Sequence, residues 1–162
     1  MIRKSMLAVL LAAPFIVQAQ TTLPTTQYLP LELATKAAQA TVQACAKDGY
    51  AVSVAVVARE GAVQVVLKED SSGPHTGSSA QGKAFTAAAM GRDTAGLAEF
   101  IASKPENNGL RDMDSRMVIQ GGGLPIKFNG VLVAGIGVGG APTGAIDAAC
   151  AMEGLKAIGA DL

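Results

Sequence analysis

The chain has 162 residues, of which 49% are hydrophobic, 4% aromatic and 16% charged. This length suits one domain of ordinary size with a core of its own. Thirteen Lys and Arg residues balance thirteen Asp and Glu residues, so the chain lacks the basic field that would hold nucleic acid. With one histidine, His75, and two cysteines, a closed four-ligand zinc site within one chain is strongly disfavoured.

Residues 1–19 have the three parts of a secretory signal peptide. Arg3 and Lys4 provide a positive start, residues 6–17 are mostly apolar, and Ala19 ends a Val-Gln-Ala cleavage signal. The apolar stretch is shorter than the roughly 20 residues that span a bilayer. We therefore expect export to a periplasm or to the extracellular space, with no membrane span after processing.

Export changes the interpretation of Cys45 and Cys150, which lie in the first and last predicted helices. In an oxidising compartment the two thiols can form a disulfide, provided that the helices are neighbours and the Cα spacing suits a bridge. The alternative is a pair of small, buried apolar residues. The sequence leaves both open because it does not supply the geometry.

After a flexible polar leader over residues 20–30, apolar periodicity and turn residues divide the chain into helices and strands. The predicted helices cover residues 31–47, 75–91, 94–103 and 142–159. The predicted strands cover residues 51–59, 62–68, 117–120, 124–128 and 131–138. Gly-containing turns at Glu60-Gly61 and Asn129-Gly130 join strands into hairpins, which pair antiparallel. The pattern predicts one α+β domain over residues 31–162, with a five-stranded antiparallel sheet covered by helices.

His75 opens the helix predicted over residues 75–91, directly after Pro74. The helix dipole disfavours a charged imidazole at this end, and the neutral imidazole is the form that ligates iron. One histidine can be an axial ligand of haem, because the porphyrin supplies four nitrogens, but it cannot build a bare metal site. The alternative is a capping or surface histidine without a ligand.

Lys83 follows His75 by two helical turns, and Thr76, Ser79 and Thr86 add hydroxyl groups to the same helix. Such a stripe can bind a carboxylated ligand. It is more typical of a solvated helix face.

Three glycines, Gly121 to Gly123, precede Leu124 and Pro125 between two predicted strands. Their bare backbone amides can approach a ligand closely or form a nest for an anion. A sharp bend between strands would use the same residues, so both interpretations stay open. The glycines of residues 135–140 differ, since they lie inside a predicted strand and lack the spacing of a dinucleotide loop.

A mixed cluster of charges lies in and just after the polar loop that follows the helix predicted over residues 94–103. Its members are Arg111, Asp112, Asp114 and Arg116. Such a cluster is typical of a solvated loop with local ion pairs.

Several segments together resemble the GlcG/HbpS family, also called the haem-degrading domain family. They are PHTGSSAQGKAFTAA over 74–88, Thr94, GGGLPI over 121–126, NGVLVAGIGVGGAP over 129–142 and DAACAMEGL over 147–155. The resemblance covers residues 31–158 and implies a profilin-like fold. Such a fold has a five-stranded antiparallel sheet flanked by helices on both faces.

The resemblance also implies a ligand and partners. Secreted members of the family often form octamers, bind haem, and can act as partners of a sensor kinase. Carried onto this chain, it implies ligand binding by His75, Lys83, Thr86, Gly121, Gly122, Gly123 and Pro125. His75 is then the candidate axial ligand of the haem iron.

Three functions remain for comparison. The one we favour is an exported, homo-oligomeric haem-binding protein for haem storage, scavenging or sensing. The alternatives are an enzyme acting on a tetrapyrrole or small organic acid, and a ligand-free module that binds a signalling partner. The lone histidine and the lack of a nucleophile–base pair argue against a hydrolase, while turnover of another kind stays open.

Overall fold

The computed structural model describes residues 22–162, so the predicted signal peptide lies outside the described part of the chain. Helices and strands alternate in nearly the predicted order. They are α1 (Leu31–Lys47), β1 (Ser53–Ala58), β2 (Val63–Lys68), α2 (Thr76–Met90), α3 (Thr94–Ser103), the 3-10 helix η1 (Pro105–Asp112), β3 (Gly123–Phe128), β4 (Val131–Gly139) and α4 (Gly144–Ile158). The predicted α+β class, the four helices and the two hairpins are confirmed.

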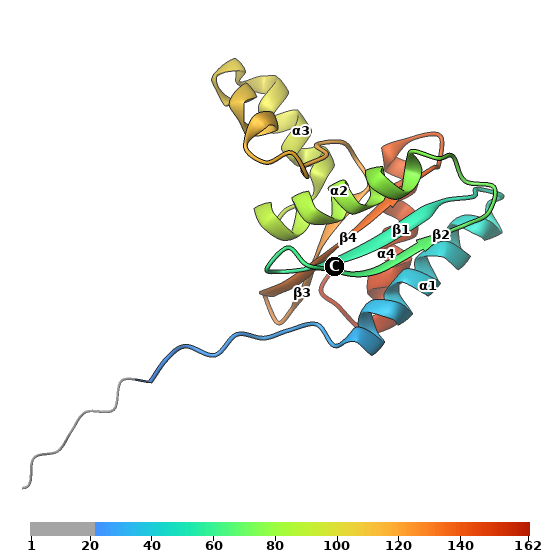
Figure 1. Ribbon diagram of the computed structural model, residues 1–162, viewed down its shortest axis with the longest axis horizontal. Helices are drawn as coiled ribbons and strands as arrows, with labels where there is room; N and C mark the ends of the chain where they lie inside the picture. The colour runs from blue at the N-terminus through green and yellow to red at the C-terminus, as the bar shows by residue number, and fades with distance from the viewer. Residues whose placement is uncertain (1–21) are drawn as a thin grey trace, which may run out of the picture.

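The strands form one antiparallel sheet in the order β2-β1-β4-β3. Each hairpin contributes one inner strand, and the inner strands pair with each other, with Val54 opposite Val138 and Val57 opposite Gly135. Helix α2 covers one face of the sheet, and α1 and α4 cover the other (Figure 1). The expectation of helices on both faces is therefore confirmed.

The expected fifth strand at residues 117–120 is wrong, because the sheet of the described chain has four strands. This segment runs beside α2 instead. The amide of Val118 donates to Thr86 Oγ1 over 2.9 Å and to the Gly82 carbonyl over 3.4 Å. Its backbone partners are thus helix residues and not the edge of a strand, which periodicity along the chain could not distinguish.

The face under α1 and α4 holds the larger core, built from Leu, Ile and Val side chains of three strands and α4, with buried Ala side chains and Cys45 from α1. A disulfide between Cys45 and Cys150 joins the two helices, with a Cα–Cα distance of 5.4 Å. Of the two interpretations of these cysteines, the bridge is confirmed. The helices pack closely at Gly154, where an added Cβ would lie 2.7 Å from the Ala37 carbonyl oxygen.

The face under α2 is packed with small residues. Its buried apolar cluster consists of Ala and Val side chains from α2 and β1, namely Ala55, Val57, Ala80, Ala84 and Ala88. Gly135 and Gly137 of β4 lie directly under the helix, where an added Cβ would collide with the α2 backbone. Glycine is required at these positions because the helix rests on the strand backbone.

Beyond α2, the chain forms a projection made of α3 and η1, which extends from the body of the domain (Figure 1). Asp93 caps α3 by accepting a 2.6 Å hydrogen bond from the Gly96 amide. At the other end of the molecule, the predicted leader finishes in the core, where Leu29 is buried and its carbonyl accepts a hydrogen bond from Gln64. Within residues 22–162, no helix combines the length and apolar character needed to cross a membrane.

Candidate functional site

His75 occupies the N-cap position of α2, directly after an exposed Pro74. Its side chain is exposed and makes no capping hydrogen bond. The imidazole is therefore not used to satisfy the first turn of the helix, although its carbonyl accepts from the Ser79 amide over 3.0 Å. The ring stays available to a ligand.

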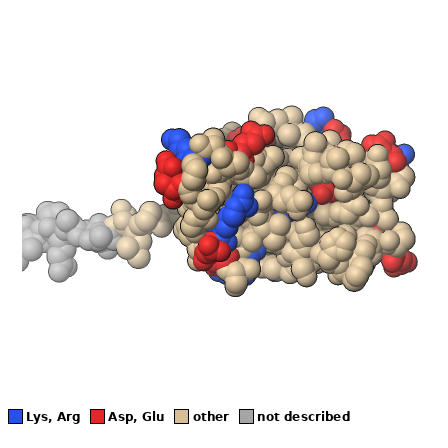
Figure 2. Space-filling view, turned by 90° about the horizontal axis from the view of Figure 1, so that it is seen from above, with Lys and Arg blue, Asp and Glu red and all other residues tan. Residues whose placement is uncertain are grey.

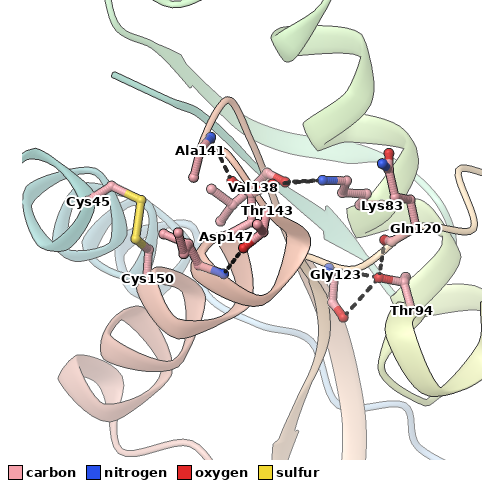
Figure 3. Close-up of polar contacts among 11 residues, drawn as sticks. Cys45, Lys83, Thr94, Gln120, Gly123, Val138, Ala141, Thr143, Asp147 and Cys150 are labelled. Atoms are coloured by element: carbon pink, nitrogen blue, oxygen red, sulfur yellow. Dashed lines mark hydrogen bonds and ion pairs between the residues drawn. A yellow bond between two sulfur atoms is a disulfide. The ribbon is translucent and has the colours of Figure 1, made fainter. Parts of the chain in front are cut away.

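Lys83 points into the protein from the middle of α2 and is 3% exposed. Its Nζ donates to the Val138 carbonyl over 2.8 Å and to Asp147 Oδ2 over 2.9 Å. The other carboxylate oxygen of Asp147 accepts from the Ala141 amide over 3.1 Å. Figure 3 shows how this buried ion pair connects α2, the end of β4 and α4. Both charges are compensated internally, as a buried pair requires.

Thr86 is also buried. Its Oγ1 donates to the Gly82 carbonyl over 2.8 Å and accepts from the Val118 amide over 2.9 Å. The side chain therefore fastens the segment after η1 to α2.

The glycine loop that precedes β3 packs between the same elements. Gly122 has a φ of 112°, and an added Cβ would lie 2.7 Å from the Asp147 Cβ and 3.0 Å from Lys83 Nζ. An added Cβ on Gly123 would lie 2.6 Å from the Lys83 carbonyl oxygen. The loop thus bends sharply against the buried ion pair, and Thr94 Oγ1 accepts from the Gly123 amide over 2.9 Å (Figure 3).

The structure therefore separates the predicted site residues into two groups. Lys83, Thr86 and the glycine loop surround the inner side of α2, with Pro125 half-buried in the adjoining strand. His75 lies apart from them at the exposed start of the helix. Their roles as ligand contacts stay predictions.

An open groove of about 370 Å³ lies on the outer side of α2. The β1–β2 hairpin forms one wall and the segment before β3 forms the other. The groove is lined by Val57, Gly61, Val63, Ser78, Ser79, Gln81, Gly82, Phe85, Ser115, Arg116 and Val118. His75 is not part of this lining, but it lies one helical turn before Ser78 and Ser79, which are, and its ring lies beside Gly73.

Arg116 lines the groove beside Phe85. Its guanidinium carbon lies 4.0 Å from the centre of the Phe85 ring, a cation–π contact. The predicted local ion pair in this loop is confirmed, since Arg116 Nε and Nη2 donate to Asp114 over 3.0 and 2.6 Å. These hydrogen bonds lower the pKa of Asp114 to about 2 and raise the pKa of Arg116.

A larger hollow of about 820 Å³ lies between α1 and α4, next to Cys150. It opens on the face of the sheet opposite α2, so none of the predicted site residues lines it. No group of three or more His, Cys, Asp and Glu residues within 22–162 is placed to hold a bare metal ion. The α2 groove is the hollow whose lining includes residues one helical turn from His75.

Figure 2 shows a face of the molecule on which uncharged residues dominate and Lys, Arg, Asp and Glu are scattered or mixed. No single-sign field covers this face, in agreement with the balanced composition.

Sequence analysis missed the structural or site role of three residues, Phe85, Arg116 and Asp147. Phe85 belongs to an Ala-rich helix, yet its spacing from Ser78 and Gly82 places all three on one side of α2. The sequence around Arg116 is typical of a solvated loop, and the stacking of Arg116 on Phe85 depends on tertiary structure. Asp147, the partner of Lys83, lies 64 residues away in the sequence, so the pairing leaves no local signal.

Comparisons with known proteins agree with this fold. A family model described as haem degrading protein HbpS-like matches residues 29–156. The chain is 42% identical to a double mutant of HbpS from Streptomyces reticuli, with a TM-score of 0.78, covering 90% of this chain and 97% of that chain. A structure of HbpS is 44% identical with a TM-score of 0.77, covering 85% of this chain and 96% of that chain.

A more distant similarity concerns the fold alone. The structure of a PduOC:heme complex is 24% identical to this chain, with a TM-score of 0.76, and covers 83% of this chain and 98% of that chain. No curated protein sequence matches the chain.

Proposed function

This chain belongs to the HbpS-like family of haem-degrading proteins, and from that premise we propose that it binds haem beside α2, with His75 as the axial ligand of the iron. The observation that carries the proposal is an exposed imidazole, free of capping bonds, one turn from an open groove. The PduOC relative is known in complex with haem, which supports haem as the ligand.

The residues around the groove fit the two chemical sides of haem. Val57, Val63, Phe85 and Val118 offer apolar contact to the macrocycle, and removing apolar surface from water favours binding. Ser78 and Ser79 add hydroxyl groups between these walls and His75. The groove is open along one side, so a ligand larger than the hollow can extend beyond it.

His75 suits the role of iron ligand because its side chain is exposed and makes no capping hydrogen bond. The lone pair of an imidazole nitrogen can bind iron. Bound haem would supply iron-centred ligand or redox chemistry, while the chain supplies one nitrogen and the walls.

Lys83, Thr86, Gly121, Gly122, Gly123 and Pro125 remain part of the proposed site. Their buried contacts support a positioning contribution. The ion pair and the glycine loop hold α2 against the sheet, and Thr86 holds the wall that carries Val118. A ligand bound on the outer side of α2 would depend on this support to meet a rigid surface.

Export and assembly belong to the same proposal. A disulfide persists in an oxidising compartment, so the Cys45–Cys150 bridge supports a periplasmic or extracellular location. The exposed Val63 and Val66 on edge strand β2 support self-association into a homo-oligomer. We further propose a role in haem storage, scavenging or sensing, the last through a sensor protein.

A hemin titration followed by absorbance tests the binding proposal. We expect a saturable shift of the Soret band in the purified protein, and its loss in His75→Ala, because His75 is the sole histidine of the chain. Gln39→Ala, an exposed polar residue on α1, serves as the control and should bind like the wild type. A shift that does not saturate, or that persists in His75→Ala, would contradict the proposal.

The family description also names the degradation of haem. Adding a reductant to the hemin complex distinguishes the two functions. A stable Soret band supports storage or sensing, whereas progressive loss with release of a product supports an enzyme.

A further inference from the structure

Arg116 is held at the edge of the α2 groove in a fixed orientation. One face of the guanidinium lies over the Phe85 ring, with 4.0 Å between the guanidinium carbon and the ring centre. Two of its three nitrogens donate to Asp114, over 3.0 Å from Nε and 2.6 Å from Nη2. Contacts with two neighbours therefore fix a side chain that would otherwise be free on a loop.

The third nitrogen, Nη1, is the one left for a ligand. Within the described part of the chain it has no hydrogen-bond partner, and the Arg116 side chain is 60% exposed. Nη1 lies toward the β1–β2 turn, 3.5 Å from the position of an added Cβ on Gly61. Because Gly61 carries no side chain and lines the groove, the space beside Nη1 is open to a ligand.

We infer that Arg116 binds a carboxylate of the ligand, and that the site therefore selects tetrapyrroles with free carboxylate side chains. This inference rests on the proposed haem function and names the chemistry that the site would recognise beyond the iron. Haem carries two propionates, and arginine is the side chain best suited to carboxylate recognition.

The position of Arg116 relative to His75 supports this role. The helix rises about 15 Å from residue 75 to residue 85, at 1.5 Å per residue. His75 and Phe85, on which the guanidinium stacks, are thus separated along α2 by helix residues that line the groove. A macrocycle bound along the groove would lie between His75 and Arg116.

Asp114 has two opposite effects on carboxylate binding by Arg116. Its pKa of about 2 keeps the carboxylate ionised at any pH suited to binding, so Arg116 stays anchored. It also offsets part of the guanidinium charge, and the site is open to solvent. We therefore expect one carboxylate contact to change the affinity about tenfold.

The test compares two ligands that differ in the charge of the propionates, hemin and hemin dimethyl ester. Both are titrated into the wild type, Arg116→Gln and Arg111→Gln. Arg111 is an exposed arginine of η1 outside the groove lining, and its variant controls for net charge. Thermal unfolding of each variant confirms that the fold is kept.

We expect Arg116→Gln to weaken hemin binding about tenfold, with ester binding and the Arg111→Gln affinities unchanged. Equal weakening of hemin and ester in Arg116→Gln would overturn the inference, because the effect would then be lost packing. Unchanged hemin affinity in Arg116→Gln would overturn it as well, while the proposed function stands if binding still depends on His75. Failure of the wild type to bind hemin would overturn both.

Discussion

The two faces of the sheet are stabilised in different ways. Under α1 and α4 the core contains Leu, Ile and Val side chains, and the disulfide joins the two helices. Under α2 the cluster is made of Ala and Val, and the helix backbone rests directly on Gly135 and Gly137. The first face relies on buried apolar area and a covalent link. The second relies on close backbone approach.

The candidate site lies on the α2 face, where the buried apolar side chains are small. Small residues allow α2 to lie close to the sheet, and the groove forms between its outer side, the β1–β2 hairpin and the segment before β3. The Lys83–Asp147 ion pair then ties this helix to α4, at the end of the sheet where the two layers meet (Figure 3). The position of α2 thus depends on a few specific contacts, and variants of these contacts and of the opposite face test the difference between the two faces.

The largest effect is expected from Lys83→Met. Removing the ammonium leaves the buried Asp147 without its partner, which costs about 3–5 kcal/mol of unfolding free energy. Urea denaturation measures the loss. Lys156→Met is the matched control, because the Lys156–Glu153 pair is exposed and should contribute under about 0.5 kcal/mol.

A second variant separates charge burial from packing. Lys83→Met with Asp147→Leu removes both charges and should be more stable than Lys83→Met alone. A double variant as unstable as the single one would show that the loss comes from packing or from the hydrogen bonds to Val138 and Ala141, and not from an unpaired buried charge.

Loss of the disulfide should have the next largest effect, on the opposite face. The bridge closes a sequence separation of 105 residues, and its removal in Cys45→Ala with Cys150→Ala should cost about 2–4 kcal/mol. Hydrogen exchange should show faster exchange in α1 and α4 and little change in α2. Equal acceleration in all three helices would mean that the two faces are not stabilised separately.

The smallest effect is expected from Gly137→Ala. The added methyl group would meet the α2 backbone at Ala80 and Ala84, so the helix must shift at a cost of about 1–3 kcal/mol. Gly77→Ala adds the same group to α2 where nothing lies within 4 Å, and should be neutral or stabilising by up to about 1 kcal/mol. Thermal unfolding of the two variants compares them. Similar losses would argue against close backbone packing as the determinant of this face.

Local sequence signals determined most of the elements of this protein. Apolar periodicity and the Gly-containing turns identified the helices and both hairpins, because these signals act between neighbours in the chain. The motifs over residues 74–155 identified the family. Residues 117–120 have the composition of a strand, and only the position of α2 decides that their amide bonds to Thr86.

The candidate site depends on contacts between segments that are far apart in the sequence, so the sequence alone could not define it. The sequence alone marked His75 as the sole histidine of the chain and placed it at the start of a helix. It also placed Lys83 on a helix, but it did not indicate the direction of the ammonium group. That direction depends on Asp147 and on the end of β4, which the sheet topology brings to the same place. Likewise, Arg116 meets Phe85 only after the chain has passed through α3 and η1 and returned to α2. Contacts between distant segments depend on packing, and packing is decided by the whole fold.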